Sequence, residues 1–508
     1  MRDNRGSISM FVALILLVVL SSIFLLIDGV RIVYGSTKLK QTIVGANEHV
    51  LANYHRELQQ RYHLFLLDPA FIAEKGISEE IQSYFEKSIC NSKEKNIFYP
   101  FQIQTISIVK EVYPDEDNLA LIKHQIREYM KYKQTVEWTN ELTGKMTILK
   151  DKDRQEEETK NLLEQQQKDM ESQLEEDTVL NLDEGEMREE ENSENVIEKV
   201  QEDPRQIVME IVNGGILRAV LPSGKSISSR TIISNSLPST ELKNMQEQEG
   251  MAKIIDFSGL DMIKNMFSDS RITEAMSNMA TESTTISYIM DSFSNFSKKS
   301  DKNQATKLNY EIEYIIHGGK TDKENLENIV NRILLFRFGT NFSYALTDAS
   351  LNAQALSIAA SIAGLMGLPP IITALKTMIL AAVSYGEAIL DVRSLLSGNK
   401  IPILKNASNW TISVERIGQI LNSKTVATSD KNGMDYEDFL KIFLLSQSNK
   451  EAKYGKMLDL MQENIKIKDK SFDIMEALFG YEVYCEIKLS TLFGNGTKIL
   501  KANRSCSY

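Results

Sequence analysis

An uncharged apolar run near the N-terminus constrains this chain more than any other feature of its sequence. The run covers 20 residues, from Ile8 to Ile27, and contains no Asp, Glu, Lys or Arg. As a helix that rises about 1.5 Å per residue it is roughly 30 Å long, which matches the hydrocarbon core of a bilayer. We therefore expect a single membrane-spanning helix in contact with lipid. The expected anchor residues are Ile8, Phe11, Leu14, Leu17, Leu20, Phe24 and Ile27.

A cleaved signal peptide is the alternative interpretation of the same run. The apolar region of a signal peptide is usually shorter and ends at a pair of small residues, whereas the segment from Ile27 to Val30 offers only a poor cleavage site. The sequence thus favours an uncleaved anchor.

The flanking charges do not set the orientation of this anchor. Arg2 and Arg5 precede it, and Arg31, Lys38 and Lys40 follow, so basic residues balance across the membrane. Because a very short N-terminal tail usually stays inside, we expect residues 1–7 in the cytoplasm and the bulk of the chain outside the cell.

The apolar pattern continues beyond the membrane run. Apolar side chains recur at steps of three or four residues up to Asp68-Pro69, which predicts one long helix ending near Leu67. A helix half in lipid and half packed on a head domain is typical of pilins. The stripe consists of Leu39, Ile43, Ala46, Val50, Tyr54, Leu58, Tyr62 and Phe65.

Several segments resemble known proteins of tight-adherence (Tad) pilus loci. The N-terminal segments resemble those of TadE/TadG-like proteins, and nearly the whole chain except its acidic middle resembles an uncharacterised Gram-positive family found beside such pilus-assembly genes. The segments that carry the resemblance are Arg5–Ser9 (RGSIS), Asp28–Arg31 (DGVR), Ala52–Leu58 (ANYHREL), Tyr62–Asp68 (YHLFLLD), Gly214–Leu217 (GGIL), Tyr310–Ile316 (YEIEYII), Asn325-Leu326 and Glu387–Arg393 (EAILDVR).

The resemblance implies a structural or accessory component of a Tad-like pilus or secretion apparatus. Its partners would be the lipid bilayer and other membrane proteins of that apparatus. Gly6-Ser7 has the form of a prepilin-type cleavage site, but Phe11 stands where true pilins usually carry Glu. We therefore expect an accessory component rather than the fibre subunit.

The negative charge of the chain is concentrated in one segment. Residues 151–200 hold 19 acids and 6 bases, and the whole chain has a formal charge of −12, so the remainder is close to neutral. No basic stripe is present, and binding to a phosphate backbone requires one, so we expect no nucleic-acid partner. The acidic segment itself is expected to be a solvated, disordered linker.

The overall pattern predicts an α+β protein that is predominantly helical. Residues 98–113 alternate as a strand does, and a helix is expected over about 118–132. The expected parts are a tail (1–7), the transmembrane helix (8–27), a proximal helix (28–68), a small α+β region (69–134), a charged helical arm with the acidic linker (135–203), and a mainly helical domain with a C-terminal β-hairpin (204–508).

Two apolar helical stretches, 353–368 and 371–396, allow two interpretations. They form either a membrane hairpin or two core helices of a bundle. Lys376 and Glu387 interrupt the second stretch, and the first is rich in Ala, Ser and Gly, which favours the bundle.

The C-terminal hairpin predicts a specific cysteine pair. Asn495-Gly496 has the composition of a two-residue type I′ turn, which places Cys485 directly opposite Cys506. We expect a disulfide there, and hence an oxidising exterior. Two buried free thiols are the alternative.

The sequence offers little evidence of catalytic chemistry. The five His residues form no metal-ligand spacing, and no nucleotide-binding or hydrolase motif occurs, so we expect no enzyme, metal, cofactor or small-molecule substrate. Glu387 and Asp391 share one helix face, and Glu311 and Glu313 lie close together. These acids are either ion-pair partners, with Arg393, Lys376, Arg332 or Arg337, or the acids of a surface hydrolase. A ligand-binding ectodomain is a further alternative.

Overall fold

The structure is a computed structural model in which the chain forms two compact units. Unit 1 combines Met1–Tyr129 with Met461–Tyr508, and unit 2 is Met130–Leu460. The chain is predominantly helical and has one small antiparallel sheet, as the sequence predicts. The structure describes residues 5–90, 101–131, 133, 138–150, 203–233, 236–242, 271–298, 305–366, 371–422, 425–447, 449–491 and 496–508.

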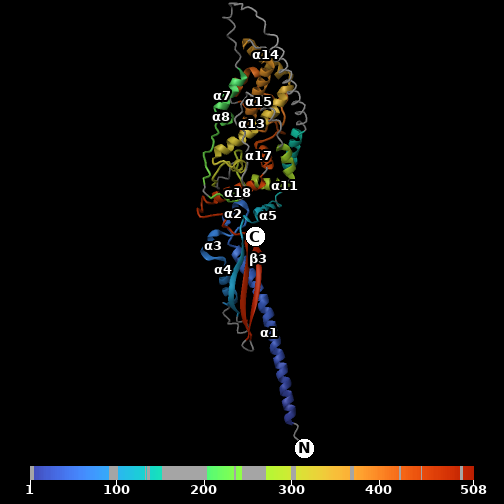
Figure 1. Ribbon diagram of the computed structural model, residues 1–508, viewed down its shortest axis with the longest axis vertical. Coiled ribbons are helices and arrows are strands. Elements are labelled where there is room, and N and C mark those ends of the chain that lie inside the picture. Colours follow the sequence, from blue (N-terminus) through green and yellow to red (C-terminus); the bar gives the residue numbers. More distant parts are fainter. Residues whose placement is uncertain are drawn as a thin grey trace, which may run out of the picture. The chain divides into compact units, whose positions relative to one another are not determined.

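One helix, α1 (Arg5–Leu51), dominates the N-terminal part of unit 1 (Figure 1). Its first half is exposed and apolar. Its second half is amphipathic and buries one side of the predicted stripe against the sheet. The buried members of the stripe on α1 are Leu39, Ile43, Ala46 and Val50.

The prediction that this helix continues to about Leu67 is wrong. The Asn53 side chain donates hydrogen bonds to the carbonyls of His49 and Val50, which closes the last turn of α1. His55 then caps a new helix, α2 (Arg56–Tyr62), by accepting from Leu58 N at 3.2 Å. The apolar spacing survives because α2 also buries Leu58 and Tyr62, but the chain turns between the two helices.

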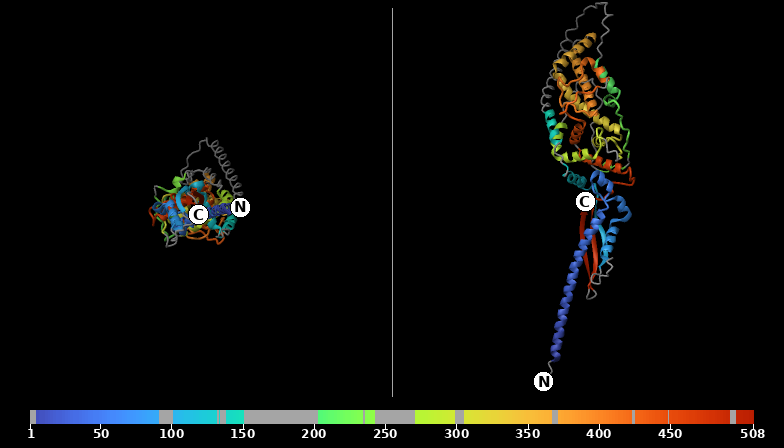
Figure 2. Two further views of the ribbon diagram at one scale, coloured as in Figure 1. Left: turned by 90° about the horizontal axis from the view of Figure 1, so that it is seen from below. Right: turned by 180° about the vertical axis from the view of Figure 1, so that it is seen from behind.

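Three antiparallel strands in the order β1-β2-β3 form the sheet of unit 1: β1 (Phe101–Val112), β2 (Gly480–Ser490) and β3 (Thr497–Ser507). The predicted strand 98–113 is confirmed as β1. A strand from the first quarter of the chain thus pairs with a hairpin at its end, and the strands lie beside α1 in unit 1 (Figure 2). The residues packed between the sheet, α1 and α4 include Ile81, Phe85, Tyr481, Val483, Cys485, Ile487 and Leu500.

Short helices complete unit 1. Asp68 caps α3 by accepting from Ala70 N, and Pro69 occupies the first helical position, where its missing N–H costs nothing. The elements are α3 (Pro69–Lys75), α4 (Ile77–Phe85), a π-helical turn η1 (Glu86–Cys90), a 3-10 turn η2 (Glu116–Leu119) and α5 (Ala120–Met130).

Unit 2 is a helical bundle built around α15 (Ile372–Leu396). Nearly every residue of α15 from Ile379 onward is buried, and α13 (Asp322–Thr347) and α14 (Ala349–Met366) pack against it. The other elements are α7 (Pro204–Asn213), α8 (Ile216–Val220), α9 (Pro238–Glu241), α11 (Arg271–Ser292), α12 (Glu311–His317), η5 (Val414–Arg416), α16 (Ile417–Asn422), α17 (Tyr436–Leu445) and α18 (Lys450–Ile465), the last of which crosses into unit 1.

The burial of α15 favours the bundle interpretation for the second predicted stretch, residues 371–396. A membrane hairpin would expose apolar side chains to lipid, whereas α15 buries them inside unit 2. Side-chain caps open two helices of this unit. Thr321 accepts from Glu324 N at 3.1 Å to open α13, and Asp435 accepts from Asp438 N at 2.9 Å to open α17.

The predicted Cys485–Cys506 register is wrong. Ser490 pairs with Thr497, so six residues rather than two connect the strands, and the register moves by four positions. Cys485 lies opposite Ala502 and Cys506 opposite Tyr481, and both thiols are free. Four residues along a strand correspond to about 13 Å, too far for a disulfide. The oxidising exterior inferred from this disulfide is therefore not supported.

The division of the chain also differs from the predicted domains. The C-terminal hairpin belongs to unit 1 with the N-terminal segments rather than to a domain spanning 204–508. Within the predicted charged arm, residues 138–150 are helical. The acidic segment 151–200 lies outside the described residues.

Candidate functional site

The exposed half of α1 is the first candidate site. Among the described helices, α1 alone is long and apolar enough to cross a membrane, and the mean hydropathy of its most apolar 18-residue window is 3.1 with none of that window buried. The predicted anchor residues all lie on this exposed half, where only Phe24 is partly covered. Such a helix fits a membrane anchor, and it also fits a signal sequence.

Polar groups within this helix are satisfied internally. Ser21 and Ser22 both donate to the carbonyl of Val18, at 2.8 and 2.9 Å. In a hydrocarbon environment an unsatisfied hydroxyl costs free energy, so these bonds suit a helix surrounded by lipid.

The charged residues at the end of the apolar run turn toward the sheet. Arg31 is 3% exposed and donates to Asp28 Oδ1 at 3.0 Å and to the carbonyl of Ser490 at 3.2 Å. Asp28 and Arg31 thus lie on the side of α1 that faces the sheet. The opposite side of the helix therefore remains apolar past Ile27.

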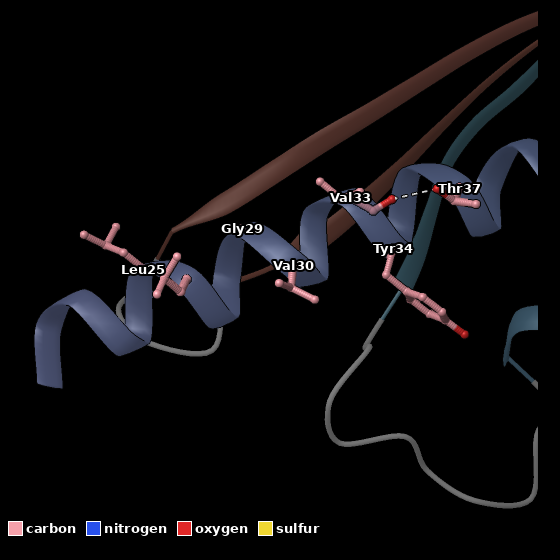
Figure 3. Close-up of a pocket in the computed structure, with 7 residues that line it drawn as sticks. Leu25, Gly29, Val30, Val33, Tyr34 and Thr37 are labelled. Carbon is pink, nitrogen blue, oxygen red and sulfur yellow. Dashed lines mark hydrogen bonds between the residues drawn. The ribbon is translucent and has the colours of Figure 1, made fainter.

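That opposite side carries an open apolar hollow of about 600 Å³ (Figure 3). The side chains of Val30 and Val33 line this hollow and are 65% and 67% exposed. A Cβ at Gly29 would meet no described residue within 4 Å outside its own stretch of helix, so the backbone there is accessible to a neighbouring helix. We call this surface the α1 face; it consists of Leu25, Leu26, Gly29, Val30, Val33, Tyr34 and Thr37.

The predicted prepilin-type cleavage residues, Gly6 and Ser7, lie in the first turn of α1. Helical backbone there is continuous with the apolar run. A protease would have to bind this turn in an extended form, which a terminal turn adopts more readily than a helix interior.

A buried ionic cluster in unit 2 is the second candidate site. Its centre is the predicted acid pair, Glu387 and Asp391, on α15. Lys405 Nζ lies 2.5 Å from Glu387 Oε1 and 2.9 Å from Asp391 Oδ1, and Arg337 Nε on α13 lies 2.9 Å from Asp391 Oδ2. All four charged side chains are fully buried.

Hydrogen bonds complete this cluster. Asn341 donates to Asp391 Oδ2 at 3.0 Å, and the backbone N–H of Ile412 donates to Glu387 Oε2 at 2.9 Å. The cluster thereby joins α13, α15 and the segment that carries Lys405 and Ile412. Buried charges persist when they are paired and hydrogen-bonded, as they are here.

The surroundings of Glu387 and Asp391 shift the pKa values of their carboxyl groups. Burial raises the pKa of Glu387, and the attraction of Lys405 offsets this only in part. Burial would also raise the pKa of Asp391, but the charges of Arg337 and Lys405 outweigh it and hold that pKa below its ordinary value. The pKa values of the two acids are therefore shifted in opposite directions.

The predicted ion pairing of these acids is confirmed for Arg337, which pairs with Asp391. The prediction that Arg393 pairs with them is wrong. Arg393 instead donates to the carbonyls of Ala219, at 2.8 Å, and Thr425, at 2.7 Å. Sequence reasoning missed Lys405. The available signal was its place as the lone basic residue after Ile401-Pro402-Ile403-Leu404, since a base inside an apolar segment often has a buried acid as partner.

The other acid pair, Glu311 and Glu313, is also buried but binds hydroxyl and amide groups. Glu311 Oε2 accepts from Ser294 N at 2.8 Å and from its hydroxyl at 2.7 Å. Glu313 Oε1 accepts from Phe296 N and the Tyr436 hydroxyl, both at 2.8 Å, while its Oε2 has no hydrogen-bond partner among the described residues. Burial raises the pKa of Glu313 to about 7. These acids fix the segment after α11 to α12 and α17.

Within the described residues no group of three or more His, Cys, Asp or Glu is placed to hold a metal ion. The fold and the α1 face define a class: a protein with one N-terminal apolar helix that continues without a break into the packing of an antiparallel sheet.

The chain belongs to a protein family of unknown function, DUF5702, whose model matches residues 194–489, more than half of the sequence. No curated protein and no solved structure matches the chain. The family match covers unit 2 from residue 194 onward and β2 as far as Leu489, but not the apolar helix.

Proposed function

We propose that this protein is a membrane-anchored, non-enzymatic component of a Tad-like pilus or secretion apparatus. In this proposal residues 1–7 stay in the cytoplasm, the apolar run spans the membrane and both units lie outside the cell. The protein acts by packing, with α1 and its folded units presenting surfaces to other subunits.

One observation carries the proposal. A single unbroken helix is exposed and apolar over its first half and packed beneath a sheet over its second half. This joins a lipid-embedded segment rigidly to a folded head, which is the mechanical requirement for a subunit held in a membrane assembly. The resemblance to TadE/TadG-like proteins supports the same conclusion.

The length of the apolar surface adds a second argument. Residues 8–27 already span roughly 30 Å, so Val30 and Val33 extend the apolar side about 9 Å further. An untilted helix would place these residues outside the hydrocarbon core. A neighbouring protein helix on the α1 face would remove them from water.

Photo-crosslinking in intact cells tests this proposal. A photoreactive residue at Val30 is expected to link the protein to another membrane component of the apparatus. Val33→Glu should abolish the link because it buries a charge in the contact, whereas Val33→Leu keeps the face apolar and should retain it. A correctly inserted protein that links only to lipid, in all variants, contradicts the proposal.

The hydrolase alternative depends on Glu387 and Asp391 reaching a substrate. Both are fully buried and bound to cations, which favours a structural role. The conservative variants Glu387→Gln and Asp391→Asn distinguish the two roles. Reduced stability is expected if the acids are structural. A variant that folds normally but lacks a hydrolytic activity of the parent would support the hydrolase alternative.

A further inference from the structure

The outer edge of β3 is an unusually regular strand edge. All 11 residues of β3 pair with β2 in one uninterrupted register, from Ser490–Thr497 to Gly480–Ser507. The opposite edge strand, β1, differs, because its register shifts twice, between Ile103 and Thr105 and between Ile108 and Lys110. Such irregularities discourage further pairing, and β3 has none.

The hydrogen bonds of the hairpin show which backbone groups face outward. Thr491 N donates to Gly496 O at 2.9 Å, so these residues form a hydrogen-bonded pair. Because such pairs alternate in an antiparallel ladder, the next pair is Leu489 with Lys498, and Tyr481 with Cys506 also belongs to the series. The residues between them direct N–H and C=O away from β2: Ile499, Lys501, Asn503 and Ser505.

These outward groups are open to solvent. All four side chains are exposed, and none of the four has a backbone hydrogen bond to another described residue on the outer side. The helix α1 covers the sheet face rather than this edge. A Cβ at Gly35 of α1 would lie 3.0 Å from Leu500 and 3.1 Å from Phe101, which places the helix over the face formed by β3 and β1.

The charge of β3 indicates what kind of strand can bind there. The strand contains Lys498, Lys501 and Arg504, all exposed, and no acid. Lys501 is paired with Glu486 at 2.7 Å, whereas Lys498 and Arg504 have no acidic partner among the described residues. A second copy of β3 would bring six bases together, and like charges across strands are destabilising. An acidic strand would complement them.

We propose that the outer edge of β3 binds an extended acidic segment of another protein as a fourth strand of the sheet. Backbone hydrogen bonds to the outward N–H and C=O groups supply the binding energy, and Lys498 and Arg504 select for acidic side chains. This inference concerns unit 1 alone and does not depend on the proposed function.

The test uses the full chain in lipid nanodiscs and a fluorescent peptide of alternating Val and Glu, about ten residues long to match a strand. Saturable binding is expected by fluorescence anisotropy. An alternating Val and Lys peptide should not bind, and neither should the Val–Glu peptide methylated at alternate backbone nitrogens, because it loses its donors.

Variants of the strand separate edge pairing from simple charge attraction. Ser505→Pro removes an outward N–H without touching the ladder to β2, and it should weaken binding about tenfold. The matched Ser505→Ala variant keeps the N–H and should bind as the parent does. Lys498→Glu combined with Arg504→Glu should reverse the preference toward the Val–Lys peptide.

Three results would overturn the proposal. The first is no saturable binding of the Val–Glu peptide to the folded parent. The second is equal binding of the methylated peptide, which remains informative even if Ser505→Pro fails to fold. The third is a dimer in sedimentation that Ser505→Pro dissociates, without peptide binding, which would make a second copy the occupant.

Discussion

Arg337 Nε lies 2.9 Å from Asp391 Oδ2, and neither side chain has any exposed area. This ion pair connects α13 to α15, the two helices at the centre of unit 2. Removal of Arg337 would leave the two carboxylates of the cluster with Lys405 alone of its two cations, and burial makes the excess negative charge costly.

Replacement of Arg337 by Ala is therefore expected to destabilise the protein by about 3–5 kcal/mol. Denaturant unfolding followed by circular dichroism measures this change. The control is Lys400→Ala, since Lys400 is 37% exposed and lies 3.7 Å from Asp435; its loss should cost less than about 1 kcal/mol. Equal effects of the two variants would contradict the structural role of the buried pair.

Glu313 should make stability depend on pH. Its pKa is raised from 4.5 to about 7 in the folded protein, chiefly by burial, so the folded state holds its proton more tightly than the unfolded state. The stabilisation is complete below pH 4.5 and is lost as pH rises through about 7, at about 1.4 kcal/mol per pH unit.

The variant Glu313→Gln removes this proton and should flatten the dependence on pH between these values. Unfolding free energies of parent and variant, measured at several pH values, isolate the contribution of this carboxyl from other titrating groups. A constant difference between the two proteins across the range would show that Glu313 does not titrate there.

Replacement of two glycines of α1 by a larger residue should affect stability differently. A Cβ at Gly35 meets Leu500 at 3.0 Å and Phe101 at 3.1 Å, so Gly35→Leu forces α1 away from the sheet and should cost about 1–3 kcal/mol. A Cβ at Gly29 would meet nothing within 4 Å among the described residues outside its own stretch of helix, so Gly29→Leu should leave unfolding of unit 1 unchanged. Thermal unfolding in detergent micelles compares them, and a larger loss for Gly29→Leu would refute the placement of α1.

The two C-terminal thiols should be free and unequal in reactivity. Cys485 is fully buried, and burial raises its pKa to about 12, whereas Cys506 is half-buried. Because the thiolate is the reactive form, Cys506 should be alkylated faster in native protein, and both should react after unfolding. Mass mapping without reductant checks this, and a Cys485–Cys506 peptide pair would contradict the register.

The local features of this fold were accessible from sequence because neighbouring residues create them. The hydroxyl of Thr321 and the carboxylate of Asp435 cap helices through amides three residues away, so their residue types predict helix starts. The C-terminal end of α1 could not be predicted, because the apolar spacing continues across Asn53 and His55 although the chain turns there.

The candidate sites were only partly predictable for a related reason. The spacing of Glu387 and Asp391 shows that they share a helix face, but their cations come from α13 and from the segment that carries Lys405. Only tertiary packing decides which bases lie within reach of a buried acid, and Arg393, close in sequence, binds carbonyls instead.

The sequence by itself determined the apolar run of α1, the alternation of β1 and the sides of the hairpin that face the core, since each follows from a short-range period. Tertiary structure decided the pairing of β1 with β2 and the register that sets Cys485 opposite Ala502. The four-residue difference in register leaves Cys485 and Cys506 on the predicted face, because an even shift preserves alternation. Side-chain periodicity fixes a face, but loop length and packing against α1 fix the position along it.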